Sequence, residues 1–501
     1  MVLATFYFQL HQPFRLHPDR DKFLWDEKNK EVFEKVADKC YIPATKMFTE
    51  ILKNYPQFKM TMSTSGTFLE QAQIYRPDVI KALQELYDTG KEREQFEFLE
   101  ETYYHSLAGL FEDSTKLEFR KQVSLHRQKL EEIFGEGVAP TSFRNTELMY
   151  NNSIAETAED MGYKTILCEK RDDMFFGGEH ISPNAIFRAR NTNKEKLELL
   201  VLPRNREMSD DIAYRFPRIH MTAERYAQNI ANIPGEAVIL GYDYEHIGEH
   251  IWGDRGIFEF WKHLPEFLSR HENVVVANPR DIAEKFKEAN CPFVDINPFS
   301  TSSWADVGKN TDGWLGNETQ NTLFKDIEGM EVGANRVKGD LRTMWRHLTT
   351  SDQIYFLHES GGQDGSVHNY FSPYGSLSRA TRVITRKIDD LSSRIDHFNI
   401  LTKAKRTAIV LVTPEVAKLP EEMGQLARYV SAKAGGLGDV VSALCEGLKD
   451  RVDVHIVTLD LKRRFQEESG KWGDDYRAHV ANLPRGNIHL IKSSIFDKSA
   501  K

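Results

Sequence analysis

Two carboxylates stand at the ends of apolar runs, where parallel strands would present them to a cleft. Glu147 closes the segment Thr-Ser-Phe-Arg-Asn-Thr-Glu-Leu, and Asp243 follows the apolar run Val-Ile-Leu-Gly-Tyr. Glycosidic bond cleavage uses two such acids, since one attacks or stabilises the anomeric carbon and the other protonates the departing oxygen. The pair therefore predicts glycosidic bond chemistry if the fold brings the two strand ends together.

Neighbouring residues indicate how the two acids divide these roles. Arg144 lies three positions before Glu147, and a nearby guanidinium lowers a carboxyl pKa and keeps the group ionised. An ionised carboxylate suits a nucleophile. Its charge would raise the pKa of Asp243 across the cleft, which suits a general acid.

A third carboxylate, Glu97, lies in the segment Phe-Glu-Phe-Leu. Alternation places it on the opposite strand face from its two phenylalanine neighbours, so it points into the lumen if the strands form a barrel. An unpaired buried charge is costly, which leaves two interpretations, a functional cleft residue or a structural ion pair with an inward arginine. Tyr104 and His105, which follow, either contact a sugar or fill the rim.

Other polar and aromatic residues are candidates for substrate binding. His11 and Gln12 follow the first strand, where they either hydrogen-bond sugar hydroxyls or form a structural turn with Pro13. Trp304, Asp306 and Trp314 form a compact cluster after residue 300. Indole faces pack on pyranose rings, but these tryptophans would equally anchor a helical bundle to a barrel.

A metal site is not expected. His246 and His250 stand at helical spacing beside Glu249, which faintly resembles a zinc motif, but the sequence offers no firm third ligand. The sequence predicts no metal and no cofactor.

The pattern of elements predicts a barrel followed by helices. Seven apolar runs alternate with helical patterns over residues 1–290, which indicates a parallel sheet covered by helices. These runs are Ala4–Leu10, Lys59–Ser63, Phe96–Leu99, Thr165–Leu167, Leu199–Leu202, Ala237–Leu240 and Val274–Ala277. Long helical patterns at Thr319–His347 and Ser376–Asn399 then predict a bundle, and the buried strand Thr407–Thr413 opens a new α/β segment.

Composition sets limits on partners and location. The 501 residues carry a net charge of −9, which argues against a nucleic-acid surface, because phosphate binding needs clustered cations. The four cysteines have no paired spacing, which suits a reducing compartment. The apolar N-terminus lacks a basic segment and no stretch has the length of a membrane span. We expect a cytoplasmic protein with no membrane partner.

Residues 1–400 resemble glycoside hydrolase family 57. The resemblance rests on an ordered set: His11-Gln-Pro, Glu97 with Tyr-Tyr-His-Ser, Asn145-Thr-Glu147-Leu and Asp243-Tyr-Glu-His-Ile-Gly-Glu-His. It implies a seven-stranded (β/α) barrel over residues 1–295, a helical bundle over 296–402 and action on α-glucans with retention. It also implies that Glu147 is the nucleophile, that Asp243 is the acid/base, and that His11, Glu97, Glu245 and Trp304 line the cleft. The loop Val307–Gly313 and the segment Leu357–Ser360 depart from the family's amylase branch.

Residues 407–495 resemble the start of the glycogen (starch) synthases of glycosyltransferase family 5. Thr413-Pro-Glu415 and Lys433-Ala-Gly-Gly-Leu-Gly-Asp439 carry this resemblance, which implies an ADP-glucose loop with Lys433, Gly435 and Gly436 near the phosphates. That family needs a second nucleotide-binding domain. We therefore expect residues 403–501 to be an incomplete, partly Rossmann-like segment without synthase activity, able to bind ADP-glucose only within a full domain.

The functional prediction is an α-amylase that cleaves α-1,4-glucosidic bonds of starch, glycogen or maltooligosaccharides by double displacement. Two alternatives stay open at this point. The same acids serve a 4-α-glucanotransferase or branching enzyme, in which a sugar replaces water as the acceptor. The second alternative is a catalytically inactive glucan-binding module attached to a synthase.

Overall fold

The computed structural model describes residues 1–171, 184–305, 308–359, 371–403, 408–413, 419, 436–448, 453–459 and 488–491. The chain divides into two compact units, Met1–Ser392 and Ser393–Lys501.

The first unit contains a parallel barrel sheet. Its strands are β1 (Val2–Leu10), β2 (Met60–Thr64), β3 (Phe96–Leu99), β4 (Ser142–Arg144), β5 (Thr165–Glu169), β6 (Phe187–Arg190), β7 (Lys196–Arg204), β8 (Ala237–Asp243) and β9 (Val274–Val276). Seven follow the order β3-β2-β1-β8-β7-β5-β4 with parallel neighbours, while β6 pairs antiparallel with β7 and β9 pairs with β1. A parallel bridge between Glu100 and Phe143 joins the two outer strands of this order. The predicted seven-stranded (β/α) barrel is confirmed.

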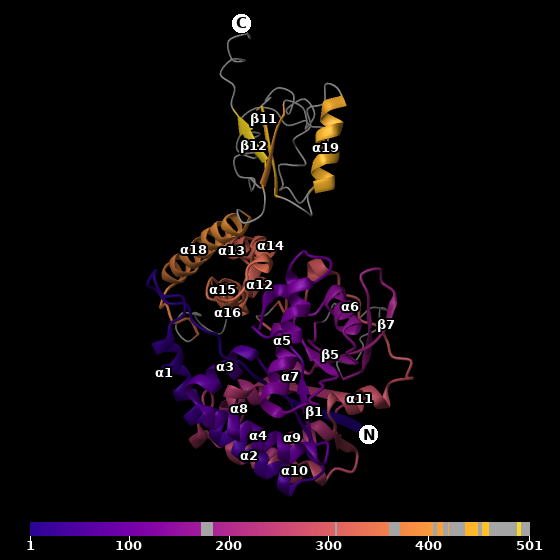
Figure 1. Cartoon of the computed structure of the whole chain (residues 1–501). Helices are drawn as coiled ribbons and strands as arrows, with labels where there is room; N and C mark the ends of the chain where they lie inside the picture. Colours follow the sequence, from indigo (N-terminus) through magenta and orange to yellow (C-terminus); the bar gives the residue numbers. More distant parts are fainter. Residues whose placement is uncertain are drawn as a thin grey trace. The chain divides into compact units, whose positions relative to one another are not determined.

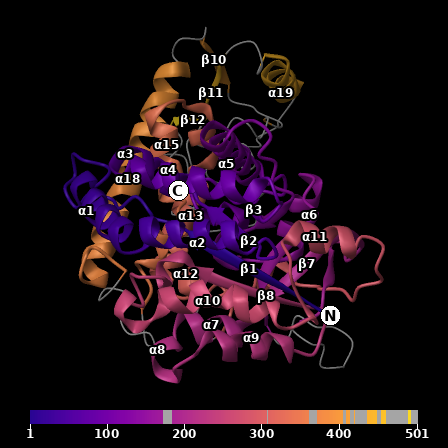
Figure 2. The same ribbon diagram turned by 90° about the horizontal axis from the view of Figure 1, so that it is seen from below.

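Helices surround these strands (Figures 1 and 2). They are α1 (Asp26–Val36), α2 (Ile42–Asn54), α3 (Gly66–Tyr75), α4 (Pro77–Lys91), α5 (Leu117–Phe134), α6 (Asn152–Asp160), α7 (Arg206–Ala213), α8 (Phe216–Ile219), α9 (Ala223–Ala231), α10 (Ile257–Ser269) and α11 (Pro279–Lys285). Short turns of other helix types are the π-turn η1 (Ala37–Tyr41) and the 3-10 turns η2 (Leu107–Leu110), η3 (Thr146–Leu148), η5 (Tyr244–His246), η6 (Gly253–Arg255) and η7 (Pro298–Ser300).

Alternating side chains sort the apolar residues into two layers. Phe6 and Phe8 of β1 point outward into the layer between strands and helices, whereas Tyr7 between them points into the lumen. Ile282 of α11 packs in the same cluster, so this helix contributes side chains to that part of the core. The period of two along β1 is therefore the direct cause of a core on both sides of the sheet.

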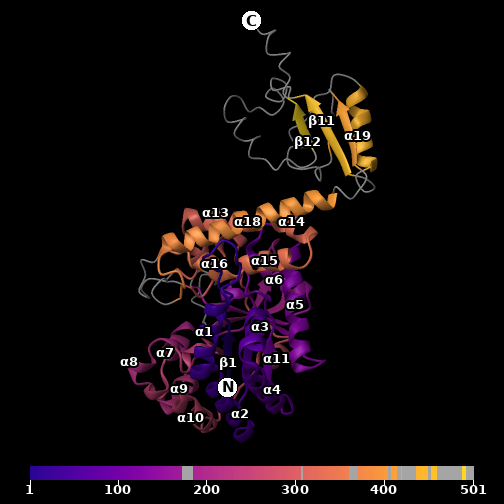
Figure 3. The same cartoon turned by 60° about the vertical axis from the view of Figure 1, so that its left-hand side comes forward.

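The bundle consists of α12 (Asp312–Leu315), α13 (Glu318–Gly329), α14 (Glu331–Arg336), α15 (Asp340–Leu348), α16 (Ser351–Tyr355) and α18 (Leu377–Lys403). Within the first unit, the part of α18 up to Ser392 lies beside α13 (Figure 3). The predicted helical stretch Thr319–His347 is broken into three helices, α13 to α15.

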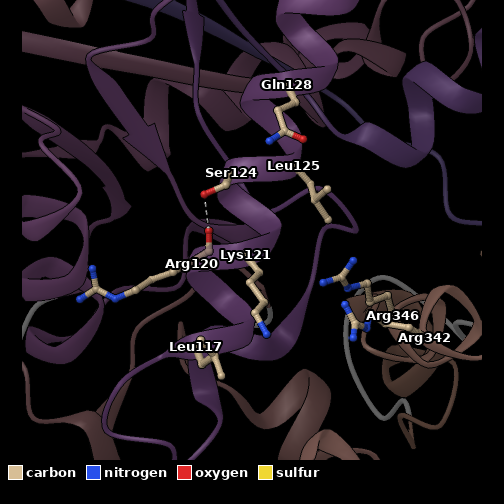
Figure 4. Close-up of a pocket in the computed structure, with 8 residues that line it drawn as sticks. All are labelled: Leu117, Arg120, Lys121, Ser124, Leu125, Gln128, Arg342 and Arg346. Atoms are coloured by element: carbon tan, nitrogen blue, oxygen red, sulfur yellow. Dashed lines mark hydrogen bonds between the residues drawn. The ribbon is translucent and has the colours of Figure 1, made fainter. Parts of the chain in front are cut away.

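A buried ion pair joins the bundle to the barrel. Arg342 and Arg346 project from α15 toward α5 across a groove of about 400 Å³ (Figure 4). The Arg346 Nε donates to Glu118 Oε1 at 2.6 Å, and Glu118 lies on the buried face of α5. Arg342 donates to the carbonyls of Ala334 and Asn335, which satisfies the end of α14. Arg346 therefore joins α15 to α5, and Arg342 joins α15 to α14.

The second unit contains a three-stranded parallel sheet among its described residues. Its strands are β10 (Ala408–Thr413), β11 (Asp453–Leu459) and β12 (Ile488–Ile491), in that order, with α19 (Gly436–Leu448) between β10 and β11 in sequence. A parallel strand pair joined through a helix is the repeating unit of α/β folds. None of the helices in the described part of the whole chain is long and apolar enough to cross a membrane.

One glycine determines how closely β8 approaches β1. A Cβ atom at Gly241 would lie 2.1 Å from Tyr7 Cε1, and the Tyr7 ring is fully buried. We expect Gly241→Ala to lower the free energy of unfolding by about 1–3 kcal/mol through overpacking. Urea unfolding followed by tryptophan fluorescence measures this, since every tryptophan except Trp472 lies in the first unit.

The matched control is Gly329→Ala at the end of α13, where an added Cβ meets nothing within 4 Å. Its change should stay within about 0.5 kcal/mol. Equal unfolding curves for the two variants would show that the Tyr7 contact does not restrict position 241.

Candidate active site

Glu147 sits on a strained turn directly after strand β4. Its φ of 56° and the φ of 53° at Leu148 are left-handed values, and each such residue costs on the order of 1–3 kcal/mol unless its surroundings hold it. The backbone N–H of Trp304 donates to the Glu147 carbonyl at 3.1 Å, and Leu148 N donates to the Asn145 carbonyl at 3.0 Å. The turn therefore aims the Glu147 side chain away from the direction of the strand.

Three side chains from separate segments contact the Glu147 carboxylate. Trp304 Nε1 donates to Oε2 at 2.5 Å, and Ser351 Oγ donates to Oε1 at 3.2 Å. His105 Nε2 lies 3.4 Å from Oε1. The first comes from the segment after the barrel, the second from the start of α16 and the third from the loop after β3, so barrel and bundle both build this site.

Charge, rather than exposure, keeps Glu147 ionised. Burial by itself raises the pKa of a carboxyl, but His105 and Arg144 outweigh burial, and the pKa of Glu147 is lowered. The sequence-based expectation that Arg144 favours the ionised form agrees with this direction, although His105 has the larger effect.

His105 is a cation held between two carboxylates. Its Nδ1 lies 2.8 Å from Glu101 Oε2, while its Nε2 faces Glu147. Burial opposes the charged ring, yet the two carboxylates raise the pKa of His105 to about 9. Glu101 also accepts hydrogen bonds from Gln9 at 3.0 Å and Ser63 at 2.7 Å. Despite its burial, the pKa of Glu101 falls to about 2, mainly through His105.

His11 stacks on His105 with ring centroids 4.0 Å apart and an angle of 21° between the ring planes. Its Nδ1 lies 2.7 Å from Ser65 Oγ and its Nε2 lies 2.9 Å from Asp352 Oδ2. Burial, followed by the charge of His105, lowers the pKa of His11. Two stacked imidazoles therefore differ in protonation, with His105 charged and His11 neutral.

Asp243 holds its proton more readily than an ordinary aspartate. It ends β8, in register with Gln9 of β1. Burial, and next the negative charge of Glu147, raises the pKa of Asp243 to about 6, against the opposing effect of Arg144 and Arg204. The pKa of Glu147 is thus lowered and that of Asp243 is raised within one buried site; the nucleophile and acid roles of the two residues stay predictions.

Two buried arginines pack on the Trp304 ring. The guanidinium carbon of Arg144 lies 4.9 Å from the ring centroid and that of Arg204 lies 5.7 Å away. Arg204 is held by the Gly241 carbonyl and by Glu169. Arg144 donates from Nε to Tyr7 Oη at 3.4 Å, but its two terminal nitrogens have no hydrogen-bond partner among the described residues. These N–H groups are therefore unsatisfied hydrogen-bond donors close to Glu147 and Asp243.

Glu245 is connected to Gln12 through a residue that sequence analysis missed. Tyr41 Oη donates to Glu245 Oε1 at 2.6 Å and accepts from Gln12 Nε2 at 3.1 Å. Burial, and then Asp243, raises the pKa of Glu245 to about 8. Tyr41 ends the π-turn η1, and π-turns commonly occur at functional sites.

The structure places three predicted cleft residues in packing roles. Glu97 points inward as predicted, but it accepts from Ser142 Oγ at 2.5 Å and from the backbone N–H of Arg280 in α11, not from an inward arginine side chain. Tyr104 packs against His347 of α15 at 5.0 Å. Trp314 is 1% exposed and packs against Tyr355 at 5.8 Å, so it anchors the bundle.

Four other predicted positions remain to be located. Asp306, Lys433 and Gly435 lie outside the described residues, and Gly436 begins α19 in the second unit.

Sequence analysis also missed residues that hold the central charges. Glu101 continues the inward alternation from Glu97 through Leu99, and this period of two is a signal that finds it. Ser351 and Asp352 lie about 200 residues from Glu147 in sequence, on a short helix. No pattern in the sequence connects them to the barrel.

His246 supports Asp243 instead of offering a free nitrogen to a metal. Its Nδ1 donates to the Asp243 carbonyl at 2.6 Å and its Nε2 accepts from Trp261 at 3.2 Å. Burial lowers the pKa of His246 to about 3. In the part of the chain that the structure describes, no three His, Cys, Asp or Glu residues are grouped to hold a metal ion.

Known proteins share this sequence and architecture. Residues 5–296 match the glycosyl hydrolase family 57. A Methanocaldococcus jannaschii protein, named provisionally as an alpha-amylase, is 37% identical over 399 residues, which are 74% of this chain and 80% of the relative. An alpha-amylase from Pyrococcus furiosus is 24% identical over 310 residues, which are 60% of this chain and 42% of the relative.

Two solved structures share the fold at low sequence identity. A family 57 branching enzyme from Thermococcus kodakaraensis has a TM-score of 0.55 at 14% identity, covering 79% of this chain and 91% of that one. An alpha-amylase from Thermotoga maritima has a TM-score of 0.51 at 12% identity, covering 81% and 94%. With the family match over more than half of its length, the chain belongs to glycosyl hydrolase family 57.

Proposed function

We propose that this protein is a retaining α-amylase that hydrolyses α-1,4-glucosidic bonds. The observation that carries the proposal is the split between the two acids, because the pKa of Glu147 is lowered while that of Asp243 is raised to about 6. Retaining hydrolysis needs an ionised nucleophile and a protonated acid at the same moment. The names of the curated relatives supply the α-glucan as substrate.

In the first step the Glu147 carboxylate attacks the anomeric carbon, and the bond to the leaving oxygen breaks as Asp243 gives that oxygen its proton. In the second step Asp243 takes a proton from water, and the resulting oxygen attacks the same carbon and releases Glu147. The sugar leaves with its original anomeric configuration because two inversions have occurred.

The remaining site residues would bind the sugar and position the acids. The unpartnered terminal nitrogens of Arg144 are donors for sugar hydroxyl groups. Trp304 fixes Glu147 and offers an aromatic surface between two guanidinium groups. Because its pKa is raised to about 8, the Glu245 carboxyl carries a proton at neutral pH and can both donate a hydrogen bond to a sugar hydroxyl and accept one from it.

Transfer to a second glucan uses the same acids, and the Thermococcus kodakaraensis structure is that of a branching enzyme. Hydrolysis is preferred here because the curated relatives are named as amylases. We disfavour an inactive binding module because both candidate acids, Glu147 and Asp243, are present in the sequence.

We also propose that residues 403–501 correspond to the start of a family 5 glycogen synthase. Support comes from the segment Lys433–Asp439 and from the parallel strands β10 and β11 on either side of α19. On this proposal ADP-glucose would bind only within a complete synthase domain. A cytoplasmic location stays a prediction, supported by four buried, unpaired cysteines.

Product analysis on maltoheptaose tests the hydrolase assignment. We expect the native chain to release shorter sugars as the α-anomer, and Glu147→Gln to lose at least about a thousandfold in rate, because the nucleophile is gone. Chromatography and proton NMR of fresh products measure both. Longer products would assign a transferase, release of the β-anomer would exclude retention, and an unimpaired Glu147→Gln would remove the role of that residue.

Asp243 should set the alkaline limit of activity. Its pKa is raised to about 6, so the proton that the leaving oxygen needs is present below that pH and is lost above it. We expect kcat/KM for maltoheptaose to fall as pH rises above about 6. An aryl glycoside, whose leaving group needs little protonation, is the control and should show a flatter profile. Parallel profiles for the two substrates would contradict this role.

His105 should set the acidic limit as a positioning residue. Its positive charge lowers the pKa of Glu147, so in His105→Gln the Glu147 carboxyl should protonate at higher pH. We expect the acidic limb of the profile to move upward by about 1 pH unit or more. Glu97→Gln is the matched control, because it removes another buried barrel carboxylate that contacts Ser142 and α11. A limb that moves equally in both variants would show a general effect on the fold.

A further inference from the structure

A groove outside the catalytic network lies between η1 and the loop that follows β8. It has a volume of about 530 Å³ and is lined by Lys39, Pro43, Gly248, Trp252, Gly253 and Phe258. We call it the Trp252 groove.

The exposed indole is the feature that calls for an explanation. Trp252 is 59% exposed, whereas Trp261, Trp314 and Trp345 are each at most 1% exposed. An indole combines a large apolar face with one N–H donor, and tryptophan is enriched at binding interfaces for this reason. The Lys39 ammonium lies 5.7 Å from the Trp252 ring centroid, so apolar and polar groups meet at one place.

Two glycines of the loop pack closely against their neighbours. A Cβ at Gly248 would lie 2.0 Å from the Lys39 carbonyl, and the φ of Gly248 is +104°, a value that side chains rarely adopt. A Cβ at Gly253 would approach the Phe258 ring at 3.5 Å. The loop therefore passes close to η1 without side chains that would fill the space beside Trp252.

Lys39, which lies over the indole, is also paired with the buried carboxylate of Glu249. Glu249 Oε1 lies 2.6 Å from Lys35 Nζ, and Oε2 lies 3.5 Å from Lys39 Nζ. The buried Oε2 accepts no hydrogen bond within the described structure. An exposed aromatic face beside the Lys39 ammonium group matches a neutral polyhydroxylated ring, which presents apolar C–H faces and hydroxyl edges.

The groove shares its two segments with the active site. The π-turn η1 contributes Lys39 to the groove and Tyr41 to the hydrogen bond with Glu245. The loop after Asp243 contributes Glu245 to the active site and Trp252 to the groove. A chain bound on this surface is thus held by the same segments that form one wall of the catalytic site.

We propose that the Trp252 groove is a second binding site for an α-glucan chain, which stacks a glucose ring on Trp252. This rests on the proposed α-glucan activity. A protein partner fits less well, because stable protein interfaces bury on the order of 1,200 Å² or more, and the groove offers six lining residues. Binding at a second site would raise the apparent affinity for a polymer without changing the chemistry on short sugars.

Glycogen binding by the full chain tests the proposal. In the Glu147→Gln background, which prevents turnover, we expect Trp252→Ala to weaken apparent glycogen affinity by about three- to tenfold, and Trp252→Phe to weaken it less. Affinity electrophoresis measures this. In the otherwise native chain, Trp252→Ala should leave kcat/KM for maltotriose within about twofold of the native value, because the active site is intact.

Val332→Ala, at an apolar position of α14 that is 65% exposed, is the matched control and should bind glycogen like its parent. Unchanged glycogen affinity in Trp252→Ala, with maltoheptaose still cleaved, would overturn the groove assignment alone. An equal loss on maltotriose would place Trp252 within the active site and overturn a second site. A change in oligomeric state instead of glycogen affinity would make the groove a contact between copies of the chain. Absence of both cleavage and glycogen binding in the native chain would overturn the proposed function together with the groove.

Discussion

The imidazolium of His105 between Glu101 and Glu147 is the interaction on which the site depends. A buried ionised carboxylate is costly unless a partner charge and hydrogen bonds compensate for lost hydration. Glu101 receives that compensation from Gln9 and Ser63 as well as from His105. Because Glu101 is held as an anion, it holds His105 as a cation, and His105 in turn lowers the pKa of Glu147. The ionisation of Glu147, the proposed nucleophile, therefore depends on Glu101, which acts through His105.

The barrel supplies the geometry for this chain of charges. The bridge between Glu100 and Phe143 joins β3 to β4, so Glu101 and Arg144 follow directly where the two strands meet. On the facing side, Gly241 allows the Tyr7 ring to lie against β8 and to meet Arg144. The ends of parallel strands are where such barrels collect functional groups, and here the closure of the ring is what brings them within reach of one another.

Local patterns in the sequence predicted what depends on short-range periodicity. The period of two along Val2–Leu10 identified the first strand, and acids at strand ends identified Glu147 and Asp243. The same reasoning could not tell whether Trp304 and Trp314 bind substrate or anchor the bundle. In the structure Trp304 contacts Glu147, whereas Trp314 is fully buried. Neither local sequence, Ser-Ser-Trp-Ala-Asp or Asp-Gly-Trp-Leu-Gly, indicates which indole is packed in the bundle, so only the tertiary structure separates them.

Contacts over long sequence distances were not predictable for a physical reason. Ser351 and Asp352 reach Glu147 and His11 only because the ion pair between Arg346 and Glu118 and the packing of α15 on the barrel bring α16 to the strand ends. No residue spacing records that arrangement. Glu97 shows the same limit. Strand alternation predicted its inward direction, but its backbone partner Arg280, at the start of α11, lies 183 residues further along the chain.

The mutual dependence of the two acids accounts for the dual role proposed for Asp243. Its raised pKa has two causes, burial and the negative charge of Glu147. When Glu147 forms a covalent bond to the sugar, its charge disappears, and the second cause disappears with it. The pKa of Asp243 then falls, so that the group which has just given up a proton stays ionised and can accept one from water. The change from acid to base needs no movement of the protein, since the covalent state of one carboxylate sets the proton affinity of the other.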